Sequence, residues 1–241
     1  MTQSDLIYDL GVNNGRDTEL YLLKGFRVLG VEANPNLCHI LNEKFAAYIA
    51  SGQLTLLNVG VWPEPSLLKF YVNLDNDHWS SFDPAYGCRN GTRFETIEIQ
   101  CRTTDEILRS FGVPYYMKID VEGADRHVLS DLRNTGARPP FISVEEFGVA
   151  CIDSLHDLGY PKFKVVPQRN KSAMVPPNPA LEGSYVPRRF DGADSGLFGK
   201  ELSGEWMEYG EAREYFTSHI RDERFEYVGP AKEWHDVHAS L

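Results

Sequence analysis

The sequence predicts an α/β fold built on a mostly parallel sheet. Strand-like and helix-like patterns alternate along the first two-thirds of the chain, and several strand-like runs end in an acidic residue. The segments between these runs are long enough to hold a crossover helix, which parallel strands require. These observations together favour repeated β-α-β units over an all-helical or all-strand fold.

The N-terminal unit carries the most information. Residues 6–10 are an apolar, strand-like run, and the turn at residues 11–15 contains two glycines. A helical pattern covers residues 16–24, and the second strand, at residues 28–31, is followed by Glu32. A glycine turn after one strand and a carboxylate after the next form a nucleotide-binding cradle. We therefore expect the functional site at the carboxyl edge of the sheet.

The later elements follow from hydrophobic periodicity and capping residues. We expect Asn36 to cap a helix with apolar residues at i, i+3 and i+4 spacing, and Thr104 to cap a later one. Residues 96–101 alternate between apolar and polar side chains, as a half-exposed strand does. The further strands are expected at residues 54–57, 67–72, 96–101, 115–120, 141–145 and 163–166. Two further helices are expected at residues 124–132 and 151–158.

We expect residues 1–241 to form one domain, because the length and the 42% hydrophobic content suffice for one sizeable core. Residues 167–204 are rich in proline and glycine. An irregular segment of this length marks a lid, a binding loop or disorder. We expect a substrate lid, in which Arg188 and Arg189 face either an anionic or polyhydroxylated acceptor or the solvent. A final helix is expected at residues 206–219.

Charge and hydropathy limit the partners. The net charge of -11 argues against a nucleic-acid partner, because such proteins present basic surfaces. No apolar run approaches the roughly 18 residues of a membrane span, and the N-terminus lacks a signal-peptide pattern. The four cysteines are scattered without a C-x-x-C pair and are expected to be reduced. We expect a cytoplasmic protein with a small-molecule substrate, without a membrane partner, and make no prediction of its oligomeric state.

The glycine turn departs from the dinucleotide-binding fingerprint. Asn13 stands where G-x-G-x-x-G has its second glycine, and no G-K-[ST] follows. Asp9 at the strand end would repel a pyrophosphate, but it suits a cationic ligand without phosphate. These features favour S-adenosylmethionine, which carries a sulfonium cation. NAD remains an alternative, because Glu32 is equally suited to hold its ribose.

Four spaced segments are more specific. Residues 9–15 are similar to a D-x-G-A-N-x-G turn, residues 31–35 to an E-[PA]-N-P segment, and residues 117–124 to a K-I-D-V-E-G-A run. Residues 144–146 correspond to the strand end that follows. This set resembles the FkbM family of S-adenosylmethionine-dependent methyltransferases.

The resemblance extends over about residues 5–147, and its departures are mild. Val12 replaces the usual alanine, and Asp125 replaces the commoner glutamate. The resemblance implies methyl transfer to a hydroxyl oxygen, often on a sugar or a polyketide. It also implies the class I methyltransferase fold, a Rossmann-like sheet of seven strands with helices on both faces.

The cofactor is expected to lie along the carboxyl ends of the first strands. Asp9 and the glycine turn would meet its methionine portion, Glu32 its ribose, and residues 58–61 its adenine. Ser81, in a loop expected above the sheet edge, is a further candidate. The predicted cofactor-binding residues are Asp9, Gly11, Asn13, Asn14, Gly15, Glu32, Ala33, Asn58, Val59, Gly60, Ser81 and Asp120.

Asp120 is the first candidate for a general base. A hydroxyl nucleophile needs help to lose its proton, while the methyl displacement itself depends mainly on positioning. Asp120 and Glu122 lie at the end of a central strand, where open α/β sheets bind their ligands. Glu145 ends another strand of the predicted sheet. Glu122 and Glu145 are alternative bases or anchors for substrate hydroxyls.

These carboxylates have other roles open to them. A divalent cation bound among them would activate the oxygen, although we favour a site without a metal ligand set. Glu122 is alternatively an acid at a helix N-terminus, stabilised by the helix dipole. Lys118 is expected to pair with one of the acids.

The remaining candidates lie in loops and at the chain end. Trp79, beside Ser81, either covers the adenine or the substrate or packs within its loop. His78 is a weaker candidate for a base, and His127 is expected at an ordinary helix position. Residues 235–238 have the composition of a metal-binding tract, but we expect a solvated tail.

Two alternatives to an S-adenosylmethionine-dependent O-methyltransferase remain at this point. One is an NAD-dependent oxidoreductase, which the departures at Asp9 and Asn13 disfavour. The other is a noncatalytic S-adenosylmethionine-binding protein, which the carboxylates at Asp120, Glu122 and Glu145 disfavour.

Overall fold

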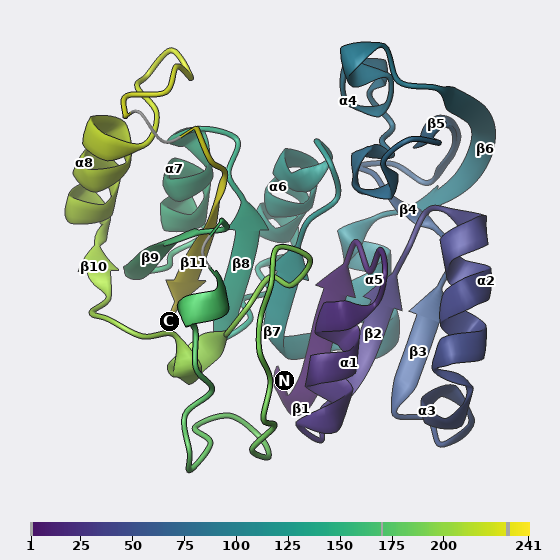
Figure 1. Ribbon diagram of the computed structural model, residues 1–241, viewed down its shortest axis with the longest axis horizontal. Helices are drawn as coiled ribbons and strands as arrows, with labels where there is room; N and C mark the ends of the chain where they lie inside the picture. Colours follow the sequence, from purple (N-terminus) through teal and green to yellow (C-terminus); the bar gives the residue numbers. More distant parts are fainter. Residues whose placement is uncertain (1, 170, 230–231) are drawn as a thin grey trace.

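An eight-stranded sheet runs through the centre of the molecule (Figure 1). The structure is a computed structural model that describes residues 2–169, 171–229 and 232–241. The strand order is β10-β9-β11-β8-β7-β1-β2-β3. The strands are β1 (Thr2–Leu10), β2 (Arg27–Val31), β3 (Leu54–Leu57), β7 (Val113–Ile119), β8 (Phe141–Glu145), β9 (Lys162–Pro167), β10 (Met207–Glu208) and β11 (His235–Ser240).

The strand directions confirm the predicted fold class. β1 pairs in parallel with β2 and β7, and the pairs β2-β3 and β7-β8 are also parallel. β11 is antiparallel to both of its neighbours, and β10 is antiparallel to β9. The sheet has one strand more than the expected seven, because the two residues of β10 add a short edge strand beside β9.

Helices cover both faces of the sheet, and the pleat of β1 divides the core between them. Ile7 points toward the face that packs α1 (Arg16–Leu23), α2 (Pro35–Lys44) and α3 (Ala46–Ala50). Tyr8 and Leu10 point the other way, because successive strand residues alternate between faces. That second face packs α5 (Thr104–Phe111), α6 (Asp125–Thr135), α7 (Ala150–Asp157) and α8 (Tyr209–His219).

None of the helices in the described part of the chain is long and apolar enough to cross a bilayer.

The strands expected at residues 67–72 and 96–101 exist, but they leave the main sheet. They form a separate three-stranded sheet with the order β4-β6-β5, which lies at the upper right in Figure 1. Its strands are β4 (Gly60–Val61), β5 (Ser66–Asn73) and β6 (Phe94–Arg102). Between β5 and β6 lie the short turns η1 (Asp77–Trp79), α4 (Pro84–Gly87) and η2 (Arg89–Gly91). Periodicity identified half-exposed strands, but it carries no information on which strands they pair with.

The expectation of a solvated tail at residues 235–238 is wrong. These residues begin β11, which lies between β8 and β9, and all six residues of the strand are buried. Val237 is 0% exposed. The strand was missed because polar residues alternate with Val237 and Ala239, and because its pairing partners are distant in sequence.

Helix starts differ slightly from the expected positions. Asn34, rather than Asn36, caps α2 and accepts a hydrogen bond from the Asn36 backbone N–H at 3.0 Å. Pro35 takes the first helical position, where its missing N–H costs nothing. Thr103, rather than Thr104, caps α5. The last helix, α8, begins at Tyr209 and not at residue 206, because Met207 and Glu208 pair with β9.

The segment at residues 167–204 packs along α1 instead of standing free. Its Phe190, Leu197 and Leu202 form a buried cluster with Leu20 of α1. The ammonium of Lys24 pairs with Glu201 at 2.9 Å, and both side chains are almost fully buried. After Pro167, which ends β9, the regular elements among the described residues of this segment are η3 (Lys171–Ala173) and η4 (Gly199–Glu201). Tertiary packing therefore holds an irregular backbone against the domain.

The buried position of β11 leads to a prediction about folding stability. The substitution Val237→Asp places an unpaired charge in the middle of the sheet and should destabilise the fold by several kcal/mol, since no described group there compensates it. Chemical unfolding followed by circular dichroism measures the loss. Val175→Asp is the matched control, because Val175 is 76% exposed. Equal unfolding midpoints for the two variants would contradict the central position of β11.

Candidate active site

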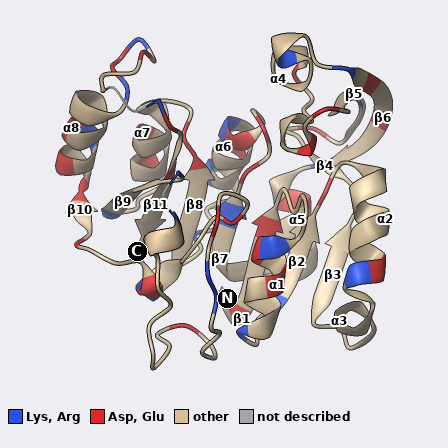
Figure 2. Cartoon of the chain, in the orientation of Figure 1, with Lys and Arg blue, Asp and Glu red and all other residues tan. Residues whose placement is uncertain are grey.

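Two adjoining cavities open at the carboxyl ends of the central strands, where acidic residues gather (Figure 2). The inner cavity has a volume of about 80 Å³ and the outer cavity about 510 Å³. The inner cavity is lined by Gly11, Asn13, Val31, Glu32, Ala33, Val59, Gly60, Val61, Phe70, Asp77, His78, Ser80, Phe82, Asp120, Val121, Glu122 and Ala124. The outer cavity is lined by, among others, Asp17, Trp79, Tyr86, Arg89, Lys118, Asp120, Glu122, Asp125, Glu145, Glu146, Lys171, Arg221, Phe225, Tyr227, Trp234 and Asp236.

Gly11 lets the turn after β1 approach the end of β7. Its φ is +90°, and a Cβ at this position would lie 1.8 Å from the carbonyl oxygen of Asp120. Any side chain would therefore push the two strand ends apart. Asn13 continues the turn with a φ of 50° and lines both cavities. The turn thus presents backbone to the cavities.

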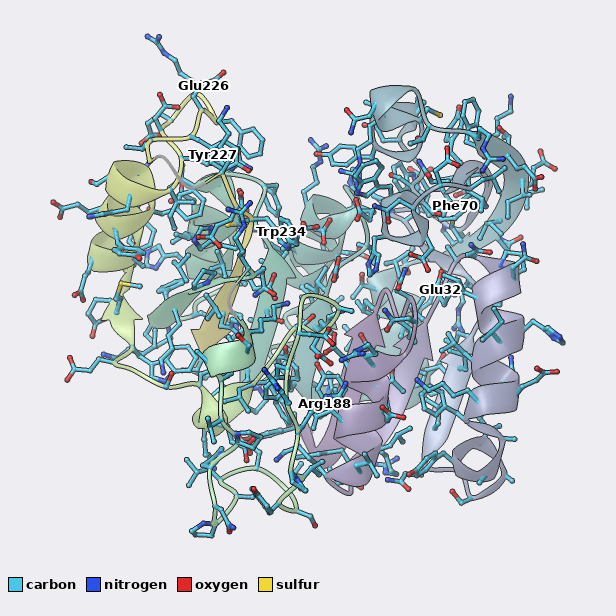
Figure 3. The ribbon with its side chains drawn as sticks, in the orientation of Figure 1. Glu32, Phe70, Arg188, Glu226, Tyr227 and Trp234 are labelled. Carbon is cyan, nitrogen blue, oxygen red and sulfur yellow. The ribbon has the colours of Figure 1, made fainter. Side chains whose placement is uncertain are left out.

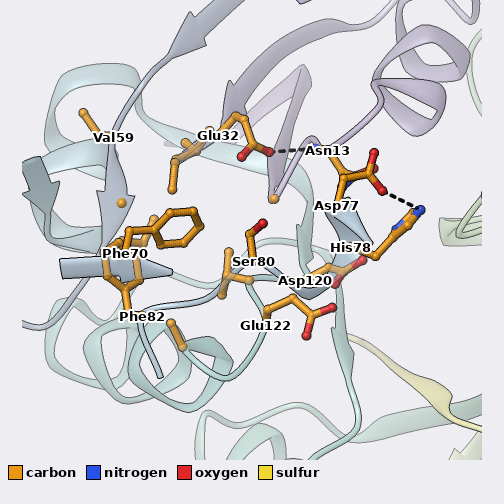
Figure 4. Close-up of a pocket in the computed structure, with 17 residues that line it drawn as sticks. Asn13, Glu32, Val59, Phe70, Asp77, His78, Ser80, Phe82, Asp120 and Glu122 are labelled. Atoms are coloured by element: carbon orange, nitrogen blue, oxygen red, sulfur yellow. Dashed lines mark hydrogen bonds and ion pairs between the residues drawn. The ribbon is translucent and has the colours of Figure 1, made fainter. Parts of the chain in front are cut away.

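Glu32 closes the inner cavity from the end of β2 (Figure 4). Its two carboxylate oxygens accept backbone N–H bonds from Asn13 and Asn34, each at 2.8 Å. A carboxylate has about four lone-pair sites, so two acceptor sites remain for a ligand. The predicted position of Glu32 as an acceptor for a ribose fits this geometry.

The wall opposite Glu32 is apolar and comes from the second sheet (Figure 4). At this wall the ring centres of Phe70 and Phe82 lie 4.9 Å apart. Gly60 leaves room for them, since a Cβ there would lie 2.3 Å from the Phe82 ring. The inner cavity therefore combines one carboxylate with an aromatic slot, which suits the flat base and the diol of a nucleoside.

Lys118 holds the acids at the junction of β1, α1 and β7. Its Nζ lies 3.2 Å from Asp120, 3.4 Å from Asp9 and 3.6 Å from Asp17. Burial opposes the charge of the ammonium, but the surrounding carboxylates raise the pKa of Lys118 well above its usual value. The expected pairing of Lys118 with an acid is present, and it involves three acids. Asp9 is fully buried and also accepts a hydrogen bond from Thr18 at 2.6 Å.

Asp120 occupies the point where the cavities meet. Its side chain is 41% exposed, although the Lys118 ammonium holds one of its oxygens. The turn that follows is organised by Asp125, which accepts N–H bonds from Val121 at 3.2 Å and Gly123 at 3.0 Å. The departure of Asp125 from the commoner glutamate therefore leaves a working turn.

Glu122 lies beside Asp120 in a left-handed backbone conformation, with a φ of 47°. It pairs with Arg89 at 2.9 Å, and Arg89 lies 4.6 Å from the centre of a Trp79 ring. Burial and the nearby charge of Asp120 raise the pKa of Glu122 to about 8. Glu122 lies two residues before the N-cap of α6 and lines both cavities, so its role in the site and its role at the helix N-terminus both stay predictions.

Glu145 and Asp236 extend the acidic row along the sheet edge into the outer cavity. Burial, with the charges of Asp120 and Glu122, raises the pKa of Glu145 well above its usual value. Burial also raises the pKa of Asp236 to about 8. Asp236 was missed at the sequence level because β11 was missed.

The predicted cofactor-binding residues fall into two groups. Gly11, Asn13, Asn14, Glu32, Ala33, Val59, Gly60 and Asp120 line a cavity. The other four support the walls from behind. Asp9 acts through Lys118, Gly15 caps α1, Asn58 donates to the Glu32 carbonyl at 2.9 Å, and Ser81 donates to the Glu122 carbonyl at 2.6 Å. Direct contact of these four with a cofactor stays a prediction.

His127 and Arg188 make internal contacts, whereas His78 lines both cavities and stays a weaker candidate for a base. His78 lies 3.7 Å from Asp77 at the inner cavity. His127 packs on Trp62 with ring centres 4.5 Å apart, and burial lowers its pKa. Arg188 pairs with Asp194 and, at 3.5 Å, with Glu19 of α1. Arg188 was expected to face either the acceptor or the solvent, but it makes these internal pairs instead. Residues 192–195 of the same segment do line the outer cavity.

Among the residues that the structure describes, no group of three or more His, Cys, Asp or Glu side chains is arranged to hold a metal ion.

The sequence comparison decides the family. The model of the methyltransferase FkbM domain matches residues 9–160, which is more than half of the chain. The chain belongs to the FkbM methyltransferase family. This membership confirms the predicted family, whose model is that of a methyltransferase domain. A comparison with curated proteins finds no match.

Several solved structures are similar at low identity. The methyltransferase FkbM from Methylobacillus flagellatus KT is 18% identical with a TM-score of 0.41, over 60% of this chain and 33% of that chain. Precorrin-6y C5,15-methyltransferase from Geobacter metallireducens GS-15 is 11% identical with a TM-score of 0.41, over 99% and 81%. The glycopeptide N-methyltransferase MtfA, solved with S-adenosyl-L-homocysteine, is 12% identical with a TM-score of 0.35, over 99% and 83%. This chain thus spans a third of the length of the first structure.

The residues present fit S-adenosylmethionine. Gly11 and Asn13 present backbone to the cavities, and Glu32 keeps free acceptor sites for a diol. The slot between Glu32 and Phe70 is apolar on one side, as an adenine requires. When bound, this cofactor supplies an electrophilic methyl carbon on a cationic sulfur.

The close approach of Gly11 to Asp120 leads to a prediction about stability and ligand affinity. Gly11→Ala should reduce both thermal stability and affinity for S-adenosylhomocysteine strongly, because the new Cβ collides with the Asp120 carbonyl. Gly25→Ala is the matched control, since Gly25 has a φ of +91° but nothing within 4 Å of a Cβ. The control should show only the backbone strain, about 1–2 kcal/mol. Melting curves and calorimetry measure both effects. Similar losses in both variants would contradict the steric role of Gly11.

The raised pKa of Asp236 leads to a prediction about how folding stability depends on pH. Because its pKa is raised to about 8 from 3.8, the folded state holds a proton that the unfolded state releases near pH 4. The stability of the ligand-free protein should therefore fall as the pH rises toward about 8, by up to about 1.4 kcal/mol per pH unit from this group. Asp236→Asn cannot titrate and should flatten the slope in urea unfolding. The exposed-site variant Glu64→Gln should keep the original slope; an unchanged slope in Asp236→Asn would refute the raised pKa.

Proposed function

We propose that the chain transfers the methyl group of S-adenosylmethionine to a hydroxyl oxygen of a small acceptor. The observation that carries this proposal is the position of Asp120, which lines both cavities. A carboxylate at this junction reaches the cofactor on one side and the acceptor on the other. The outer cavity, at about 510 Å³, has the size of a small-molecule site.

The inner cavity is the proposed cofactor site. Glu32 would accept the ribose hydroxyls, and the Phe70 wall would cover the adenine. Asn13 and Asn14 also line the outer cavity, so the methionine portion would lie between the two cavities. This arrangement points the reactive carbon toward the acceptor and leaves positioning as the main source of catalysis.

Asp120 is the proposed general base. The acceptor oxygen forms a bond to the methyl carbon while the carbon–sulfur bond breaks, and the hydroxyl proton passes to the Asp120 carboxylate. Lys118 fixes one carboxylate oxygen at 3.2 Å and leaves the exposed part of the side chain for the acceptor. Glu122 and Glu145 are the alternatives. The Glu122 carboxylate is already paired with Arg89. Glu145 ends β8, one strand further than β7 from the cofactor cavity.

The family match favours this function over the NAD-dependent alternative. A noncatalytic S-adenosylmethionine-binding protein would bind the same ligand without turnover, so a turnover assay tests this alternative. A divalent cation is not needed in this proposal, since Asp120 itself accepts the proton. The cytoplasmic location stays a prediction.

The cofactor site is tested by calorimetry with S-adenosylhomocysteine. Glu32→Ala should weaken its affinity about 10- to 100-fold, because hydrogen bonds to a charged acceptor are lost. Glu32→Gln, which keeps the shape, should lose less. No binding by the unmodified protein, or an unchanged affinity in Glu32→Ala, would reject the proposed site.

The base is tested by turnover. Labelled S-adenosylmethionine is offered with a panel of sugars, disaccharides and polyketide lactones, and any methylated member becomes the reference acceptor. Asp120→Asn should then lower kcat about 10²- to 10⁴-fold while S-adenosylhomocysteine still binds. Glu122→Gln and Glu145→Gln should lower it less. A greater loss in either of these two variants would transfer the role to that residue, and binding without any turnover would favour the noncatalytic alternative.

A further inference from the structure

Two carboxylates face each other on the floor of the outer cavity. Asp236 of β11 and Glu145 of β8 are direct partners in the antiparallel ladder. The Glu146 N–H donates to the His235 carbonyl at 3.0 Å, so the two acids form a non-hydrogen-bonded pair. Side chains lie closest in pairs of this kind and project from the same face of the sheet. Both acids line the outer cavity.

Neither carboxylate receives a hydrogen bond from any described residue, although Asp236 is only 8% exposed. The neighbouring acid Glu146, by contrast, is bound by Arg221. Lys171 offsets part of the charge of Asp236, but its ammonium donates to the carbonyl of Asp194. Like charges directly opposite destabilise a strand pair, and buried carboxylates are normally paired. In the ligand-free protein the raised pKa values let the pair hold protons and avoid this repulsion, and a bound cation would let both acids ionise.

Aromatic side chains from two segments line the outer cavity beside these two acids. Trp79 and Tyr86 come from the segment between β5 and β6. Tyr227 and Trp234 come from the segment before β11, and Figure 3 shows them on the opposite side of the sheet edge from Phe70. Trp234 is 47% exposed. Arg89 already lies over Trp79 and Tyr86, and Arg221 lies over Tyr227, so the face offered to a sugar ring or a cation is that of Trp234.

Few basic side chains in the cavity walls are free to bind an anionic acceptor. Arg89 is paired with Glu122, and Arg221 with Glu146. Carboxylates outnumber basic side chains around the cavity. Burial raises the pKa values of Glu145 and Asp236, so a positively charged acceptor would favour their ionised forms, whereas a negatively charged one would oppose them.

We propose that Asp236 and Glu145 form a cation subsite, and that the methyl acceptor is an amino sugar whose protonated amine binds there. The inference rests on the proposed function, because it takes Asp120 as the residue that receives the reacting hydroxyl. Strands lie about 4.8 Å apart, and β8 and β11 are the first and second strands beyond β7. The amine therefore lies roughly 5–10 Å from the reacting hydroxyl, which matches an amino sugar of one or two rings. The amine is an anchor and is not itself methylated.

The test uses three disaccharides that differ only at C2. The β-1,4-linked dimers of glucosamine, N-acetylglucosamine and glucose carry an amine, an acetamide and a hydroxyl on the same skeleton. Each is titrated by calorimetry into the full chain saturated with S-adenosylhomocysteine. The glucosamine dimer should bind about ten-fold or more tightly than the other two, as a charge-assisted contact predicts. Asp236→Asn and Glu145→Gln should each reduce the preference, and Glu64→Gln, which removes one exposed charge elsewhere, should retain it.

The outcomes separate the two proposals. If S-adenosylhomocysteine binds but the glucosamine dimer binds no better than the glucose dimer, or not at all, the cation subsite is wrong and the proposed function stands. A preference that survives in both Asp236→Asn and Glu145→Gln also overturns the subsite. If the unmodified protein fails to bind S-adenosylhomocysteine, the proposed function fails first. Retained affinity for S-adenosylhomocysteine shows that each variant is folded.

Discussion

The buried ammonium of Lys118 is the interaction on which the site depends. It joins Asp9 at the end of β1, Asp17 on α1 and Asp120 after β7. It also donates to the carbonyl of Gly11 in the turn. Without this cation, carboxylates of three elements would lie close together at the sheet edge with no compensating charge, a loss of several kcal/mol. The same contact that stabilises the edge thus fixes the position of the proposed base.

The rest of the site is assembled around this centre by segments that leave the main sheet. The three-stranded sheet supplies Phe70 to the apolar wall, and the segment between β5 and β6 supplies Phe82. The segment at residues 167–204 packs on α1 and brings residues 192–195 to the outer cavity. The three-stranded sheet lies within the residues that match the family model, whereas the segment at residues 167–204 lies outside them.

Local patterns predicted well which contiguous segments would line the cavities. The Gly11 turn, Glu32 and the run around Asp120 each belong to a contiguous segment, and each lies at the sheet edge as expected. The roles of Asp9 and Ser81 were less visible. Both are close in sequence to cavity residues but act from behind the wall, since the direction of a side chain depends on what packs against it.

The sequence by itself determined the α/β class, the parallel β-α-β order and the family, because hydrophobic periodicity and turn chemistry are local properties. Only the tertiary structure decided that residues 235–240 form a central strand and that Asp236 faces Glu145. It likewise decided that Arg188 pairs internally with Asp194. These facts depend on pairing between segments far apart in the chain, and strand pairing is specified by the surroundings of a segment more than by its own composition.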